Sequence, residues 1–210
     1  MVLEACVENI NEALLAESLG ANRIELCDYL RVGGTTPSAG TIAIARKLLQ
    51  IPIMVLIRPR GGSFIYSSNE IEIMKQDIRI CKDIGVNGVV LGVLTKEKTV
   101  DIELLHKLTT LARPLEITFH KAIDETEDIL HEFKKLMECD IDRTLTSGGE
   151  KTAFLGKHII NEMVKISNGK IKIIAAGKII KTDLPKIMKI IHTKDFHGKK
   201  IVGNLTKRFK

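Results

Sequence analysis

Tryptophan is absent from this chain of 210 residues, and aromatic residues make up only 4% of it. The core of the folded protein must therefore be built mainly from aliphatic side chains. No apolar run approaches the roughly 20 residues that span a bilayer, and the N-terminal stretch carries glutamates where a secretion signal would carry basic residues. The four cysteines are widely spaced and form no C-x-x-C pair, which indicates reduced thiols. We expect a cytoplasmic protein without a membrane segment.

Charge is plentiful but unevenly distributed. Residues 165–210 hold 13 Lys and Arg against 2 Asp and Glu, whereas residues 1–164 hold 19 against 24. A basic end of this kind can bind nucleic acid, but here no interleaved aromatic residues and no RNA-binding motif accompany it. We interpret it as a solvated lysine-rich surface, and nucleic acid is the less favoured alternative.

The stretch that organises the chain is ANRIELCDYLRVGGTTPS, residues 21–38. With the two-residue period of a strand, Arg23, Glu25 and Cys27 lie on one face, and Ile24 and Leu26 on the other. A buried carboxylate is costly, so Glu25 needs a cation, a hydrogen-bond donor or a metal nearby. The glycine loop that follows leads into a helix, so these polar groups lie at the C-terminal end of a strand, where α/β folds place their sites.

The same strand–loop–helix pattern recurs along the whole chain and predicts eight strands separated by seven helices. This alternating order of strands and helices is typical of a TIM-type (β/α)8 barrel, formed as a single domain over residues 1–210. Only the basic tail 198–210 is left for an eighth helix, which we expect to be short or missing. The barrel should then be unsealed at this end, where a second subunit could cover it. The predicted strands span residues 2–7, 23–27, 53–57, 88–91, 115–119, 143–146, 171–175 and 195–197.

Several predicted strands end in a polar residue, and in a barrel these ends converge on one rim. Arg58 and Arg60 alternate around Pro59, so both can project toward the mouth and bind carboxylate or phosphate. The alternative is that Arg58 neutralises Glu4 or Glu25 in an internal ion pair. His120 occupies the place of a general acid or base, with Asp124 as its orienting partner. The turn formed by Ser147, Gly148 and Gly149 offers backbone N–H groups to an anion.

Cys6 and Cys27 occupy equivalent places on two adjacent predicted strands. Two thiolates at close range suit Cu(I), or Zn(II) with added histidine and glutamate ligands. The alternative is that two small thiols merely fill a layer of the barrel, as free cysteines commonly do.

Seven segments resemble the CutC copper homeostasis protein family, in its order and at its spacing, between residue 2 and about residue 198. The resemblance implies a TIM-type barrel, a cytoplasmic setting, homodimers and a role in copper homeostasis. It also marks the family-typical positions, which are Glu4, Cys6, Arg23, Glu25, Cys27, Arg58, Arg60, His120, Asp124, Ser147, Gly148 and His197. The segments are LEACV, ANRIELC, GGTTPS, IRPRGG, TFHKAID, LTSGG and DFHG.

The chain departs from the family pattern at Ser63, where relatives favour aspartate, and at Lys121, where they favour arginine. Its turn after the seventh strand has fewer glycines, and its tail after the eighth is shorter.

Two functional hypotheses follow. In the first, Cys6 and Cys27 bind copper as Cu(I). In the second, the protein is an enzyme acting on a small anionic substrate. Its acid/base groups would be Glu4, Glu25, His120 and Asp124, and its substrate-binding residues Arg23, Arg58, Arg60, Ser147, Gly148, Gly149 and His197.

Overall fold

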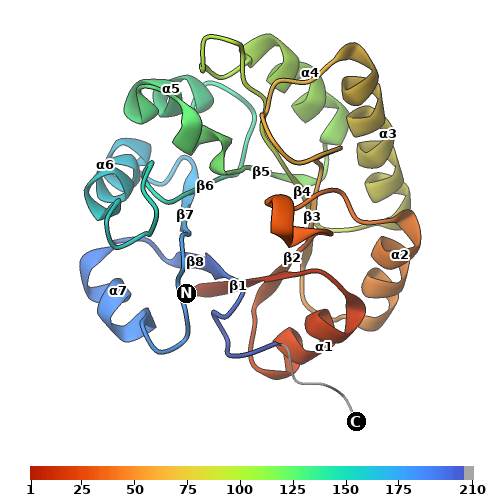
Figure 1. Cartoon of the computed structure of the whole chain (residues 1–210), viewed down its shortest axis with the longest axis horizontal. Helices are drawn as coiled ribbons and strands as arrows, with labels where there is room; N and C mark the ends of the chain where they lie inside the picture. The colour runs from red at the N-terminus through yellow and green to blue at the C-terminus, as the bar shows by residue number, and fades with distance from the viewer. Residues whose placement is uncertain (206–210) are drawn as a thin grey trace.

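The computed structural model describes residues 1–205, which form a closed barrel of eight parallel strands in sequential order (Figure 1). Each strand pairs with the next, and β8 pairs with β1 to close the sheet. The predicted fold class is confirmed. The strands are β1 (Val2–Val7), β2 (Arg23–Leu26), β3 (Ile53–Leu56), β4 (Gly88–Leu91), β5 (Glu116–Phe119), β6 (Arg143–Thr146), β7 (Lys172–Ala175) and β8 (Asp195–Gly198).

Within residues 1–205, seven α-helices surround the barrel, and local sequence signals fix several of their ends. Asn9 and Ser38 cap the first two helices through their side chains, and Ser67 with Glu70 forms a capping box on the third. The helices are α1 (Ile10–Ser18), α2 (Ala39–Leu48), α3 (Ser68–Ile84), α4 (Ile102–Ala112), α5 (Ile129–Leu136), α6 (Lys157–Ser167) and α7 (Leu184–Ile190), with 3₁₀ turns at η1 (Leu30–Val32) and η2 (Lys121–Glu125). None of the described helices is long and apolar enough to cross a membrane.

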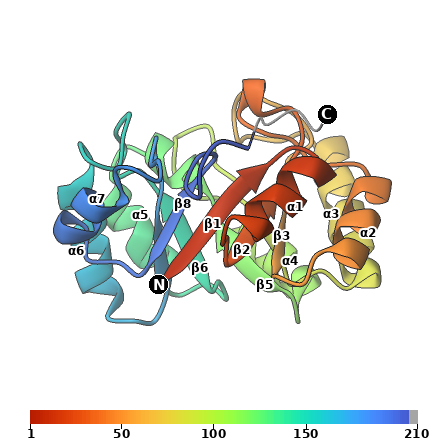
Figure 2. The same cartoon turned by 90° about the horizontal axis from the view of Figure 1, so that it is seen from below.

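Strand alternation divides each strand between two environments. The outward side chains of β1 and β2, such as Ala5, Ile24 and Leu26, join the large aliphatic core between the sheet and the helices. The inward side chains include Cys6, which contributes with Cys27 to a small separate cluster inside the barrel. In the side view, β1 runs from the N-terminus toward the end of the barrel that carries η1 (Figure 2). This end is the mouth, where the C-terminal ends of the strands meet.

The expectation that the barrel is unsealed after β8 is wrong for the sheet, which is closed by the β8–β1 pairing. No helix follows β8 within residues 1–205. Instead, residues 199–205 run from β8 toward α1 (Figure 1). Ile201, Val202 and Leu205 are buried in the main core, and Gly203 lies close to Leu19 at the end of α1. The short segment thus fills part of the place of an eighth helix. Residues 206–210 of the predicted tail lie outside the described residues.

This segment should carry a measurable share of the stability. Ile201 is fully buried, so Ile201→Ala should lower the free energy of unfolding by about 2–5 kcal/mol, because it removes buried methyl groups and leaves a cavity. The control is Ile44→Ala on α2, where the isoleucine is 48% exposed and a change within about 0.5 kcal/mol is expected. Urea denaturation of both variants measures the difference, and equal losses would show that residues 199–205 do not seal the fold.

Candidate functional site

A network of charged side chains lies inside the barrel, where β8, β1 and β2 are neighbours. Register places Glu4 beside Arg23 on one side and beside His197 on the other. The guanidinium of Arg23 donates from Nε to Glu4 and from Nη2 to Asp195, the latter at 3.3 Å. His197 Nδ1 lies 2.9 Å from the second oxygen of Glu4. These buried charges are therefore neutralised by one another.

The network changes the acidity of its members. Burial alone would raise the pKa of Glu4, but the hydrogen bond with His197 and the charge of Arg23 outweigh it and lower the pKa to about 2. Burial raises the pKa of Glu25, whose carboxylate lies 3.8 Å from His197 Nε2. Burial would lower the pKa of His197, but the charges of Glu25 and Glu4 prevail and raise it. Glu4 is thus a fixed anion.

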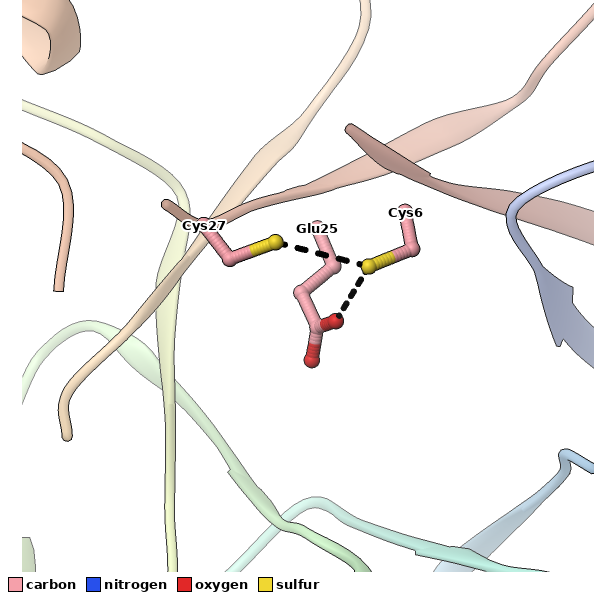
Figure 3. Close-up of side chains that lie close together, drawn as sticks. All are labelled: Cys6, Glu25 and Cys27. Carbon is pink, nitrogen blue, oxygen red and sulfur yellow. Dashed lines mark hydrogen bonds between the residues drawn. The ribbon is translucent and has the colours of Figure 1, made fainter. Parts of the chain in front are cut away.

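Next to this network, toward the mouth, two thiols and a carboxylate come together (Figure 3). Cys6 Sγ lies 3.5 Å from Cys27 Sγ and donates to Glu25 Oε2 at 3.1 Å. All three side chains are buried, and one ligand atom from each lies within 4.8 Å of the others. The sequence-based expectation that Glu25 needs a donor nearby is met by the Cys6 thiol. No other group of three or more metal-ligating side chains occurs among the described residues.

This arrangement favours the protonated form of the Cys6 thiol in the absence of a metal. The hydrogen bond with Cys27, burial and the negative charge of Glu25 all raise the pKa of Cys6 well above that of an ordinary thiol. A bound metal ion would replace the thiol protons, since the thiolate is the ligand. Two sulfur atoms and one carboxylate oxygen form a donor set that suits a soft ion, and the separation of the sulfurs is close to the roughly 3.8 Å of two thiolates on one tetrahedral zinc.

The two arginines are held by the loops around the mouth. Arg58 is buried and donates to the carbonyl oxygens of Val32, Gly34 and Gly62 at 2.7–3.2 Å, so it joins the β2–α2 and β3–α3 loops. It makes no ion pair with Glu4 or Glu25, contrary to the alternative that the sequence suggested. Arg60 pairs with Glu70 at 2.6 Å and also donates to loop carbonyl oxygens.

The glycine turn after β6 already contains an anion, the carboxylate of Asp124. This carboxylate accepts from the backbone N–H groups of Ser147 and Gly149 at 2.9 and 3.0 Å and from the hydroxyl of Thr146. Gly148 N–H donates to the same hydroxyl. The turn therefore binds a carboxylate of its own chain, and its N–H groups are not available to a substrate. For the same reason, Asp124 makes no orienting hydrogen bond with His120.

His120 is oriented by its own loop. The backbone N–H of Ala122 donates to His120 Nδ1 at 3.2 Å, so the proton of a neutral ring is on Nε2. That nitrogen is buried and has no hydrogen-bond partner among the described residues. Burial and the nearby charge of Arg58 lower the pKa of His120 to about 3. A side chain at Gly92 would collide with the imidazole, at 2.3 Å from Nδ1, so glycine is required there.

Adjoining cavities occupy the mouth. The smallest, of about 150 Å³, is lined by Glu25, Arg58 and His120 among others. A second, of about 450 Å³, lies at the ends of β7 and β8, and Cys6, Lys121 and His197 line these two. A third, of about 660 Å³, is lined by Arg58, Asp124, Ser147 and Gly149 among others.

The structure thus brings most of the predicted site residues to one mouth: Cys6, Glu25, Arg58, His120, Asp124, Ser147, Gly149 and His197, with Cys27 beside them. The fully paired Glu4 and Arg23 do not line these cavities.

Sequence reasoning did not single out Asp195, which completes the ion network. Its signal was present, because Asp195 and His197 share one face of the predicted eighth strand.

The chain matches known proteins over most of its length. The family model described as "CutC family" matches residues 1–202. The chain belongs to the CutC family. It is 40% identical over 196 residues to the copper homeostasis protein cutC homolog of Homo sapiens, covering 93% of this chain and 72% of that protein. It is 41% identical over 198 residues to the family protein CutC of Porphyromonas gingivalis, covering 94% and 80%.

Solved structures support the same assignment. The crystal structure of the putative copper homeostasis protein CutC from Streptococcus agalactiae superposes with a TM-score of 0.91 at 31% identity and covers 96% of this chain and 99% of its own. A putative deoxyribose-phosphate aldolase from Coccidioides immitis gives a TM-score of 0.70 at 10% identity, covering 95% and 81%. The second likeness shows only that the barrel fold is shared.

The buried neutral His120 should make the CutC-family chain sensitive to acid. Below pH 6.5 the unfolded chain binds a proton at this position that the folded chain accepts only near pH 3, so its contribution to stability is complete above pH 6.5 and falls as the pH decreases toward 3. Between pH 7 and pH 5, the free energy of unfolding of His120→Gln should decrease by about 2 kcal/mol less than that of the wild type, as measured by urea denaturation. The exposed His158→Gln is the matched control and should lose as much as the wild type. Equal losses in the wild type and both variants would contradict a neutral His120.

Proposed function

We propose that this CutC-family protein binds copper as Cu(I) through Cys6 and Cys27, with Glu25 beside them, and that this binding is its part in copper homeostasis. The observation that carries the proposal is the buried contact of two thiols and a carboxylate. The name of the human relative, a copper homeostasis protein homolog, supports the choice of copper. Thiols remain free in a reducing compartment, so the proposal includes a cytoplasmic location.

The donor set favours Cu(I) over Zn(II). Structural zinc is almost always held by four protein ligands, whereas three ligating side chains meet here in the part of the chain that the structure describes. His197 lies outside this group of three: its Nε2 is 3.8 Å from Glu25, and its Nδ1 is bound to Glu4. Soft thiolates select Cu(I), which accepts a low coordination number. Cys6 also lines the two mouth cavities of about 150 and 450 Å³, which gives an incoming ion or carrier a route to the sulfur.

An enzyme acting on a small anion, the second hypothesis from the sequence, is supported by fewer of its residues. Glu25 and His120 line the mouth, but Glu4 is held by Arg23 and His197. The backbone N–H groups of Ser147 and Gly149, which the hypothesis assigns to the substrate, donate to Asp124 instead. Copper binding is therefore the better supported function. Homodimer formation, which the family resemblance implies, stays a prediction.

Copper binding can be tested by titrating the reduced protein with Cu(I) in competition with a chromogenic chelator. We expect about one equivalent of tightly bound Cu(I), and its loss in Cys6→Ser and in Cys27→Ser, because each variant removes one of the two sulfur ligands. Zn(II) in the same assay should bind more weakly.

The matched control is Cys81→Ser, which changes a fully buried thiol on α3 outside the site and should keep the wild-type stoichiometry. Unchanged binding in both site variants, or equal loss in all three, would exclude the thiol pair as the copper site.

The affinity for Cu(I) should also depend on pH. Because the pKa of Cys6 is raised, its thiol must release a proton when copper binds, and the affinity should increase by about tenfold per pH unit for each proton released. Competition titrations at pH 6, 7 and 8 measure this slope. Glu25→Gln removes the negative charge that favours the protonated Cys6 thiol, and this effect alone would not weaken copper binding. A lower affinity of this variant for Cu(I) would therefore show that the carboxylate is itself a ligand. An affinity independent of pH would contradict binding to these thiols.

A further inference from the structure

The mouth cavity at the ends of β7 and β8 is lined by lysines that copper binding does not use. It has a volume of about 450 Å³, within the range of small-molecule sites, and it lies at the C-terminal ends of β7 and β8. Among the residues that the structure describes, no carboxylate lines it and four lysines do: Lys121, Lys178, Lys199 and Lys200.

Two of these four ammonium groups have partners. Lys199 Nζ lies 2.6 Å from Glu8, and Lys121 Nζ lies 3.1 Å from Asp124. For Lys178 and Lys200, by contrast, no hydrogen bond or ion pair of the ammonium group occurs among residues 1–205. The cavity therefore carries positive charge that the described part of the chain does not neutralise.

The backbone at the same place adds further donors. Neither Gly177 N–H nor Lys178 N–H finds an acceptor within the described chain. Gly177 has a φ of +110°, and a side chain there would lie 2.9 Å from Ala153 N and from Ser147 Cβ. Glycine thus lets this segment pack closely against the loop after β6.

The deeper, smaller cavity also contains unsatisfied donors. Within residues 1–205, neither the protonated Nε2 of His120 nor Nε of Arg58 has an acceptor, and both nitrogens are buried. Buried polar atoms are normally hydrogen-bonded, so these two point to a missing partner. Both are donors, and the complement of a site lined by donors and ammonium groups is a ligand rich in acceptor oxygens.

We infer that the mouth binds a small phosphorylated molecule, with its phosphate between Lys178 and Lys200 and its remaining oxygens directed toward His120. The loops after the seventh and eighth strands are the usual position of phosphate in barrels of this type. Most anion-binding groups predicted from the sequence already have partners in the chain: Asp124 occupies the glycine turn, Glu70 pairs with Arg60, and backbone carbonyls hold Nη1 and Nη2 of Arg58. The inference does not depend on copper binding.

Isothermal titration of the reduced, metal-free protein with ribose 5-phosphate tests it, with ribose and succinate as comparison ligands at the same concentrations. We expect saturable binding of ribose 5-phosphate that weakens as salt is added, and no binding of ribose. Lys178→Gln with Lys200→Gln should weaken binding at least tenfold, because both phosphate-binding charges are lost. His120→Phe, which removes the deep donor, should weaken it less.

The control is Lys47→Gln with Lys189→Gln, which removes the same net charge from exposed positions on α2 and α7 and should bind as the wild type does. Absence of saturable binding, equal loss in both double variants, or tighter binding of succinate than of ribose 5-phosphate would each overturn the inference. Because no copper is present, none of these results bears on the thiol pair.

Discussion

Burial of Glu4 inside the barrel is the constraint on which the rest of the site depends. A carboxylate with 1% of its surface exposed must be paired, and register makes Arg23 and His197 its strand neighbours. Removing one partner of such a buried pair typically costs about 3–5 kcal/mol. The network therefore fixes three adjacent strands, β8, β1 and β2, in one arrangement.

That arrangement determines where the thiols lie. Two residues after Glu4, Cys6 occupies the next inward position of β1, and the parallel register sets it beside Glu25. Cys27 follows Glu25 by the same two-residue step. Glu25, whose pKa burial raises, connects the two levels, since it lies near His197 on one side and accepts from Cys6 on the other. The charge-neutralised network thus supports a pair of soft ligands, of which Cys6 lines the mouth.

Sequence alone could predict much of this because a strand has a strict period of two. The two-residue spacing of Glu4 and Cys6, and of Arg23, Glu25 and Cys27, fixes which side chains share the inward face, and the recurrence of eight strands fixes the barrel. The packing of the segment after β8 was not predicted, because its seven residues, 199–205, have no helical pattern but bury Ile201 and Val202.

Partners in the loops could not be predicted in the same way. The guanidinium of Arg58 binds carbonyl oxygens from two loops, and Asp124 reaches the turn after β6. Such contacts depend on how loops distant in sequence come together, and no local pattern encodes them. The same reasoning applies to Lys178 and Lys200, which come from different strand ends and share a cavity only because β7 and β8 are neighbours.

The central claim is that one copper ion is held by the sulfur atoms of Cys6 and Cys27. X-ray absorption at the copper K-edge of the reduced protein loaded with one equivalent of Cu(I) tests this most directly, because it counts the sulfur neighbours of the metal. The account predicts two sulfur neighbours. A copper environment of nitrogen and oxygen atoms alone would contradict it.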